Sequence, residues 1–177
     1  MAGYAKAGRR KSEKKTVITF VVGILAFVLL FVGIVFLTQA FKNELDYKDF
    51  SNNYITDVSK IKTQSEEKYV VYLYTSNSNS ESIKDKVLEF AKENAQGIKV
   101  YFIDYSTIDD EEDTNYNADK LKELATLLDT TTDKLSNAVP ALFCVKDGSI
   151  VGRYKELTKI TGSLNDIAKG GYTKFNE

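Results

Sequence analysis

Side chains with possible chemistry gather directly after an apolar run. The stretch YVVYLYTSNSNSES, residues 69–82, passes from β-branched and aromatic residues to serines and asparagines, and a helical pattern then begins. Ser78 and Glu81 stand three positions apart in this turn. A serine hydroxyl can act as a nucleophile only when a base activates it, and the chain contains no histidine. The turn therefore offers a hydroxyl and a carboxylate without a recognisable activating group.

Cys144 is the only cysteine, so no disulfide can form within the chain. It lies inside the apolar run ALFCV, residues 141–145, where strand alternation predicts that its side chain points into packed apolar groups. A free cysteine is commonly a small buried hydrophobe. A reactive Cys144 thiol stays open as the alternative.

Consecutive acids at residues 109–113 suggest a calcium site. An EF-hand loop needs alternating ligands, a glycine at the turn and a distant glutamate, and this spacing has none of them. We interpret the run as a solvated acidic loop. The lack of histidine also excludes histidine ligands, so we expect no metal and no cofactor.

The charges are divided unevenly along the chain. Residues 1–15 contain six bases and one acid; removing these from totals of 24 and 25 leaves 18 bases and 24 acids beyond residue 15. A nucleic-acid-binding domain carries basic charge on a folded face, so we expect no nucleic acid partner. The six bases are Lys6, Arg9, Arg10, Lys11, Lys14 and Lys15.

Residues 17–37 contain no charged residue. At about 1.5 Å per residue, such a helix crosses a hydrocarbon core of roughly 30 Å, so we predict a single transmembrane helix at 16–38 with the lipid bilayer as a partner. The preceding bases place residues 1–15 in the cytoplasm as a basic tail and the rest of the chain outside it. A cleaved signal peptide, with Thr38-Gln39-Ala40 as a poor cleavage site, and binding of the basic cluster to acidic lipid or RNA are the alternatives.

A mixed polar segment, residues 39–66, follows as a juxtamembrane region that we expect to be partly helical. Its apolar residues recur at intervals of four, four and three, which predicts an amphipathic helix capped by Asp49 or Ser51. These residues are Phe50, Tyr54, Val58 and Ile61. The alternative is a stalk that becomes ordered only beside the domain.

A β–α–β pattern comes next. KYVVYLYT, residues 68–75, is rich in strand-forming residues, and Ser80 or Ser82 could cap a helix that runs to Glu93. The run IKVYFID, residues 98–104, is apolar almost throughout, as in a parallel strand buried on both faces.

The rest of the chain predicts two further strands and two helices. We expect a helix over 118–129, a turn with a short helical piece at 130–137, and strands at 141–145 and 149–154. Asp147-Gly148 between these strands is a strong hairpin signal. A final helix carries Leu157, Ile160, Leu164 and Ile167 on one side and ends at Gly170-Gly171.

Pro140, the only proline, opens the strand at residues 141–145. A proline belongs at the first residue or edge of a strand because it cannot donate to the ladder. An X-Pro bond is also where a cis peptide costs little.

The run VPALFCVKDGSIVGRY, residues 139–154, resembles the distal half of the thioredoxin fold, with a cis-proline loop, a strand, a Lys-x-Gly hairpin and an edge strand. KYVVYLYTSNSNSES resembles its first half, a strand followed by Cys-x-x-Cys at a helix N-terminus. The resemblance covers roughly residues 69–168. It implies an α/β fold, a thioredoxin-like mixed sheet flanked by helices over residues 67–177, in which a cis Val139–Pro140 bond faces the Ser78–Glu81 turn.

The departure from the family is at the redox motif. Ser78 and Glu81 stand where its two cysteines would, so with Pro140 they mark a vestigial redox site. Disulfide exchange needs an attacking thiolate and a resolving thiol, and we therefore expect no catalytic residue. In the family, the surface around the cis-proline binds extended polypeptide, a recognition mode that needs no sulfur. The resemblance places Tyr74, Asn77, Asn79 and the Val139 backbone in such a groove, unless residues 130–138 cover it or it is idle.

Three functions remain. We favour a redox-inactive, membrane-anchored module that binds or scaffolds a protein partner outside the cytoplasm. The second is an oxidoreductase with residual activity through Cys144 or a partner's cysteine. The third is a structural subunit of a membrane complex, held mainly by its transmembrane helix. The sequence leaves the oligomeric state open.

Overall fold

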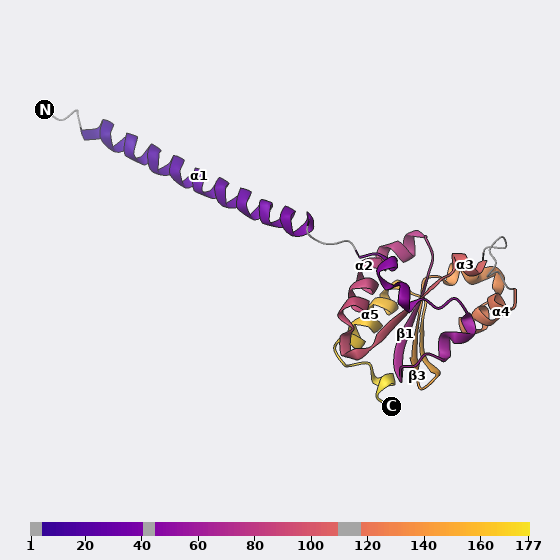
Figure 1. Ribbon diagram of the computed structural model, residues 1–177. Helices are drawn as coiled ribbons and strands as arrows, with labels where there is room; N and C mark the ends of the chain where they lie inside the picture. The colour runs from indigo at the N-terminus through magenta and orange to yellow at the C-terminus, as the bar shows by residue number, and fades with distance from the viewer. Residues whose placement is uncertain (1–4, 41–44, 110–117) are drawn as a thin grey trace. The chain divides into compact units, whose positions relative to one another are not determined.

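The computed structural model describes residues 5–40, 45–109 and 118–177, and within the first helix it describes the side chains of residues 16–34. The chain divides into two compact units, Met1–Glu44 and Leu45–Glu177 (Figure 1). The acidic run at residues 110–113 and the side chains of the basic cluster at residues 6–15 lie outside what is described.

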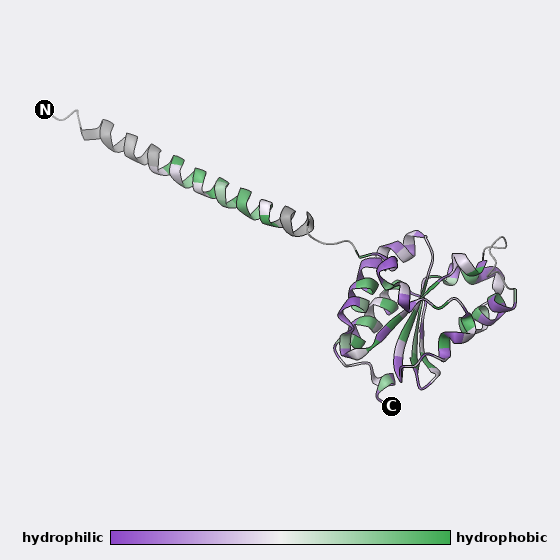
Figure 2. Ribbon diagram, in the orientation of Figure 1, coloured by the Kyte–Doolittle hydropathy of each residue, from purple (hydrophilic) through white to green (hydrophobic). Residues whose placement is uncertain are grey.

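The first unit contains α1, Ala5–Ala40. Its Thr16–Ile34 part has a mean hydropathy of 3.0 and is long and apolar enough to cross a membrane, a test that a signal sequence near an N-terminus also passes. In the described part of the chain, every exposed large hydrophobic side chain belongs to this helix, and Figure 2 shows the apolar band along it. A helix that is apolar all round suits a lipid environment, so α1 is a candidate membrane span.

The described residues of the second unit form a four-stranded mixed sheet in the order β2-β1-β3-β4. β1 (Lys68–Tyr74) pairs in parallel with β2 (Lys99–Asp104) and antiparallel with β3 (Ala141–Lys146), which forms a hairpin with β4 (Ser149–Tyr154). Asp147 and Gly148 both have positive φ, as the predicted two-residue hairpin turn requires. The predicted parallel pair and hairpin are confirmed.

Helices cover both faces of this sheet (Figure 1). One face packs against α2 (Ser78–Glu93) and α5 (Leu157–Ala168), and the other against α4 (Ala118–Leu127). Shorter helices complete the unit: η1 (Tyr47–Asn53), η2 (Val58–Lys62), η3 (Ala95–Gly97), α3 (Ser106–Asp109), η4 (Thr132–Ala138) and η5 (Thr173–Phe175). The short helical piece expected at residues 130–137 is η4.

The core follows the strand alternation. Val70, Tyr72 and Cys144 point toward α2 and α5, whereas Val71 and Phe143 point toward α4, and all five are fully buried. A central strand buried on both faces explains why the sequence of β1 is apolar almost throughout.

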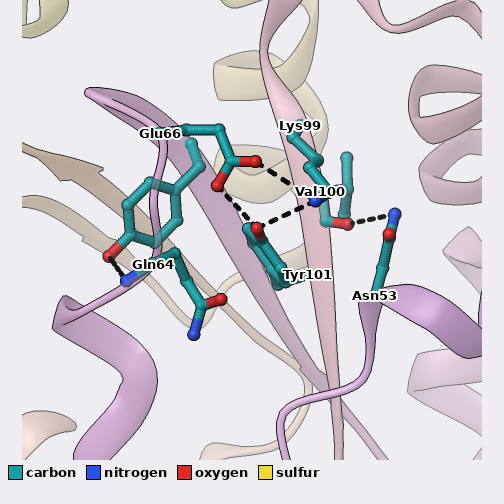
Figure 3. Close-up of polar contacts among 7 residues, drawn as sticks. Asn53, Gln64, Glu66, Lys99, Val100 and Tyr101 are labelled. Atoms are coloured by element: carbon teal, nitrogen blue, oxygen red, sulfur yellow. Dashed lines mark hydrogen bonds and ion pairs between the residues drawn. The ribbon is translucent and has the colours of Figure 1, made fainter.

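The amphipathic helix predicted across residues 50–61 is wrong, because the segment forms two 3₁₀ helices with extended backbone between them. Tyr54 pairs with Phe102 at the edge of β2, and the Ile55 N–H donates to the Phe102 carbonyl at 2.9 Å. The Asn53 side chain donates to the Val100 carbonyl at 3.0 Å (Figure 3). Since the Ile55 N–H donates to the sheet, it cannot donate to the carbonyl four residues earlier, as an α-helix requires.

The caps of these helices also differ from prediction. Asp46 caps η1 and Asp57 caps η2, while Asp49 accepts from the Asp46 N–H in a capping box. The folded unit begins at Leu45 rather than at residue 67, because Ile55, Val58 and Ile61 are buried in the core on the α4 side.

A polar cluster joins the loop before β1 to the edge strand β2 (Figure 3). The Lys99 ammonium donates to Glu66 at 3.1 Å and to the Tyr101 hydroxyl at 3.0 Å, and that hydroxyl donates to Glu66 at 2.5 Å. All three hydrogen bonds lie within the cluster, so we interpret it as a structural tie.

Smaller differences concern element boundaries. Asn77 caps α2, in place of Ser80 or Ser82. The short helix α3 lies in a stretch predicted as loop, where Asp104 accepts from the Ser106 N–H and supports its first turn. Helix α4 ends at Leu127, and Asp129 adopts a positive φ of 50° that no helix continues through.

Candidate functional site

The candidate site is built on the turn between β1 and α2. Asn77 is the N-cap: its side-chain oxygen accepts from the Ser80 N–H at 2.8 Å. Such a cap contributes about 1 kcal/mol. Ser78, Asn79 and Glu81 are exposed in the first turn, where the acidic Glu81 suits the positive end of the helix dipole. The turn therefore presents polar side chains on a firmly capped helix end.

Asn77 makes a second contact that links the turn to the loop before β3. Its side-chain nitrogen donates to the Val139 carbonyl at 3.3 Å. The Val139–Pro140 peptide bond is cis, and both residues are buried. The fold thus brings the turn that contains Ser78 and Glu81 to the loop that contains Pro140.

Ser80 has a role that sequence reasoning did not assign. It is fully buried, and its hydroxyl accepts from the Thr75 N–H at 3.2 Å. Ser80 thereby closes the loop from β1 instead of capping the helix. The sequence contained a signal for this role, because Ser80 lies on the side of α2 that faces the sheet. A serine hydroxyl buried there must form a hydrogen bond.

Tyr74, expected in the groove, is only 7% exposed. Its ring stacks on that of Tyr47, with the ring centroids 3.8 Å apart, and its hydroxyl shares a hydrogen bond with that of Tyr54 at 2.7 Å. The N-terminal segment of the folded unit therefore covers this residue. The other segment considered, residues 130–138, contributes Leu135 and Ala138 to the core on the α4 side.

The aromatic cluster under this segment is electrically neutral. Burial raises the pKa of Tyr72 to about 12 and moves the pKa values of Tyr47 and Tyr74 upward as well. All three phenols thus stay protonated at physiological pH. The buried hydroxyls of Tyr47 and Tyr72 interact with one another, and that of Tyr72 also interacts with Ser80, although none of these contacts has the geometry of a well-formed hydrogen bond.

A cleft of about 320 Å³ opens beside this cluster, at the carboxyl ends of β1 and β2. The sheet side of its wall includes Tyr74, Asp104 and Thr107. The Asp104 carboxylate accepts from the N–H of Ser106 at 3.0 Å and from its hydroxyl at 2.6 Å. The remaining lining residues come from the N-terminal segment: Asp46, Tyr47, Lys48, Tyr54, Ile55 and Thr56.

Cys144 is fully buried in the middle of β3, as its strand position predicts. Burial raises the pKa of its thiol to about 11, and the neighbouring Tyr172 hydroxyl opposes part of that rise. The Tyr172 hydroxyl occupies the space that a Cβ at Gly152 would fill. At neutral pH the thiol is therefore protonated and shielded from solvent, whereas reactive cysteines are exposed thiolates.

Metal ligation has no candidate group in the described ranges: no cluster of three or more histidine, cysteine, aspartate or glutamate residues there could hold an ion. Of the acidic run at residues 109–113, only Asp109 is described.

The sheet order, the parallel β1–β2 pair and the helices on both faces define a thioredoxin-like fold. Three similar solved structures are mitochondrial thioredoxin 3 from Saccharomyces cerevisiae (13% identity, TM-score 0.43), thioredoxin f2 from Chlamydomonas reinhardtii (14%, 0.42), and a structure concerned with thiol resolution in a yeast mitochondrial 1-Cys peroxiredoxin (14%, 0.43). Each match covers 64% of this chain and 93% of the other. No family model and no curated protein matches the sequence.

Proposed function

We propose that this chain is a membrane-anchored, redox-inactive thioredoxin-like protein that binds or scaffolds an extended polypeptide outside the cytoplasm. The observation that carries the proposal is the hydrogen bond from Asn77 to Val139. It holds the exposed first turn of α2, with Ser78 and Asn79, against the loop that leads into β3. Strand-type recognition uses a fixed main chain with adaptable polar side chains beside it, and this contact fixes the Val139 loop next to the exposed Ser78 and Asn79.

The charge of the folded unit favours a basic partner. Residues 1–44 hold seven bases and two acids; removing these from totals of 24 and 25 leaves 17 bases and 23 acids in residues 45–177. Complementary charge accelerates association and suppresses wrong partners. An unfolded basic chain is thus a suitable probe.

The absence of redox chemistry is part of the proposal. Thiol–disulfide exchange needs an attacking thiolate and a second thiol. The chain has one cysteine, and it is buried with a raised pKa. Ser78 and Glu81 offer oxygen atoms that cannot exchange disulfides.

The anchor is supported by the apolar Thr16–Ile34 part of α1, and its orientation by the bases that precede it. On this proposal the chain crosses the membrane once, with residues 1–15 in the cytoplasm.

The test uses the full-length protein in detergent micelles and reduced, carbamidomethylated ribonuclease A as the unfolded basic probe. We expect saturable binding of this probe, and none of native ribonuclease A. Asn79→Trp should weaken binding at least fivefold, because the bulky ring obstructs the groove. The matched control is Asn165→Trp on the exposed side of α5, which should leave the affinity unchanged. Equal affinity for wild type and Asn79→Trp would contradict the proposed groove.

A second candidate function, a structural subunit held by α1, is favoured by one observation. All exposed large hydrophobic side chains in the described residues lie on that helix. If this function is correct, removal of residues 1–40 abolishes assembly with the partner, whereas Asn79→Trp has no effect on it.

A further inference from the structure

Residues 45–52, which we call the strap, cover the aromatic end of the candidate groove. The Tyr47 ring stacks on Tyr74 at 3.8 Å and meets Phe102 edge-on, with the ring centroids 5.7 Å apart. Phe50 adds a tilted contact with Phe102 at 5.5 Å. The strap thus docks through two aromatic rings onto rings supplied by β1 and β2.

An ion pair accompanies the aromatic contacts. The Asp46 carboxylate lies 3.0 Å from the Lys84 ammonium on α2, and the two side chains are 49% and 21% exposed. That ammonium also lies 5.3 Å from the centroid of the Tyr47 ring. Hydrogen bonds from the Lys48 N–H and from Lys84 lower the pKa of Asp46, so the carboxylate is charged at neutral pH. The docked unit is therefore an acidic residue followed by an aromatic one.

The attachment of the strap has weak points. Tyr47 brings a buried hydroxyl to the contact, and this hydroxyl interacts with the neighbouring Tyr72 hydroxyl without reaching the geometry of a well-formed hydrogen bond. A poorly formed hydrogen bond adds little to the stability of a buried contact. The cleft of about 320 Å³ beside the strap is lined by Lys48 on the strap and by Asp104 and Thr107 on the sheet side. The ion pair is only partly buried, so its contribution to the attachment of the strap is modest.

The attachment is firmer immediately after the strap. Asn53 donates to the Val100 carbonyl at 3.0 Å, and the Ile55 N–H donates to the Phe102 carbonyl at 2.9 Å. Ile55 and Val58 are buried in the core. The chain from Asn53 onward is therefore held by contacts that do not involve residues 45–52.

We propose that the strap is displaceable, and that a partner segment with an acidic residue followed by an aromatic residue replaces Asp46 and Tyr47 on Lys84 and Tyr74. The released surface consists of Tyr72, Tyr74 and Phe102 with Lys84 at its rim. This inference rests on the proposed function, because Tyr74 lies at the end of β1, from which the chain leads directly into the turn that contains Asn77. The strap keeps that end of the groove closed in the absence of the partner.

The test uses the full-length protein in detergent micelles and, as the probe, a blocked peptide of residues 45–53, LDYKDFSNN, which is the strap and the residue that follows it. Tyr47→Ala removes the ring that occupies the Tyr74 surface. We expect this variant to bind the peptide saturably and at least tenfold more tightly than wild type does. The matched peptide LDAKDFSNN should not bind. Absence of saturable binding by a Tyr47→Ala variant with native exchange protection in β1 and β3 overturns the inference, as does equal affinity for wild type and variant.

A second variant guards against misfolding of Tyr47→Ala. Lys84→Gln breaks the ion pair with Asp46 and the cation–π contact with Tyr47, and it leaves the contacts between aromatic rings in place. We expect amides of residues 47–52 to exchange hydrogen at least threefold faster in Lys84→Gln, while β1 and β3 exchange as in wild type. If strap amides open only together with the core in both proteins, the strap is an integral part of the fold and the inference is wrong. Peptide binding by Tyr47→Ala without binding of unfolded ribonuclease A would support the displaceable strap and contradict the proposed function. Binding of unfolded ribonuclease A without peptide binding by Tyr47→Ala would support the proposed function and contradict the displaceable strap.

Discussion

The side-chain amide of Asn77 donates to the main-chain carbonyl of Val139 across 3.3 Å, joining loops that lie 62 positions apart in the sequence. The other end of the same side chain accepts from the Ser80 N–H and begins α2. One residue therefore fixes both the helix end and its distance from the loop that contains Pro140. In the proposed function, this connection keeps the groove in shape without a disulfide or a metal.

Shortening Asn77 separates its two roles. Serine also caps helices but is too short to reach Val139, so we expect Asn77→Ser to lower the free energy of unfolding by about 1 kcal/mol, the contribution of one hydrogen bond. Asn77→Ala loses the cap as well, and we expect about 2 kcal/mol. Urea denaturation followed by tyrosine circular dichroism measures both values. Asn79→Ala is the control and should stay within about 0.5 kcal/mol of wild type. A wild-type stability for Asn77→Ser would mean that the contact to Val139 contributes nothing.

The raised pKa of Cys144 predicts how stability depends on pH. The folded thiol has a pKa of about 11, against an ordinary value of 9.0. Between pH 9 and pH 11 the Cys144 thiol loses its proton in the unfolded state before it does so in the folded state. The contribution of the protonated thiol to the free energy of unfolding is therefore complete below pH 9 and decreases as the pH rises. At pH 10 the loss is about 1.4 kcal/mol relative to pH 7. Wild type should lose this much more than Cys144→Ala between pH 7 and pH 10. Parallel stability curves for the two proteins would show that the thiol titrates normally.

Gly152 should tolerate no side chain. A Cβ there would collide with the Tyr172 hydroxyl, which shares a hydrogen bond with Tyr154 at 2.9 Å. We expect Gly152→Ala to cost about 1–3 kcal/mol, as overpacking of a close contact does. Because Tyr172 lies beside Cys144, the variant should also react with a thiol reagent faster than wild type, whose thiol should react only on unfolding. The control is Gly162→Ala, whose Cβ would meet no atom within 4 Å. Unchanged stability and unchanged thiol labelling in Gly152→Ala would show that Tyr172 moves aside freely.

The N-terminal segment of the folded unit should be essential for its stability. Ile61 is fully buried among core residues on the α4 side. Ile61→Ala should therefore cost about 2–5 kcal/mol, the range for truncation of a large apolar core side chain. Lys62→Ala, at the exposed neighbouring position, should be close to neutral. Similar stabilities for the two variants would mean that residues 45–62 contribute little to the core.

The membrane anchor should remain in the mature protein. An epitope tag at the N-terminus should stay with the folded unit in the membrane fraction after alkaline carbonate extraction, because the apolar part of α1 is held in lipid. Removal of residues 1–40 should release the rest of the chain into the soluble fraction. Loss of the tag from the mature protein would instead identify α1 as a cleaved signal sequence.

The sequence alone determined the features that depend on local patterns. The uncharged run at residues 17–37 marks α1, the apolar runs mark β1 and β2, and Asp147-Gly148 marks the turn between β3 and β4. Each of these depends on the period of burial or on backbone sterics within a few residues. That is why the predicted order of the four strands and of α2, α4 and α5 agrees with the structure.

Only the tertiary structure decided which of several residues with similar local properties caps a helix, interrupts a helical pattern or covers a neighbour. Asn77, Ser80 and Ser82 are all capable N-caps, and the choice follows from the reach of Asn77 to Val139. The spacing of residues 50–61 suits a helix, but hydrogen bonds to the edge of β2 break it at Tyr54. Tyr74 lies beneath Tyr47, far from it in the sequence. Contacts between distant segments follow from how whole surfaces pack, and no local pattern in the sequence records them.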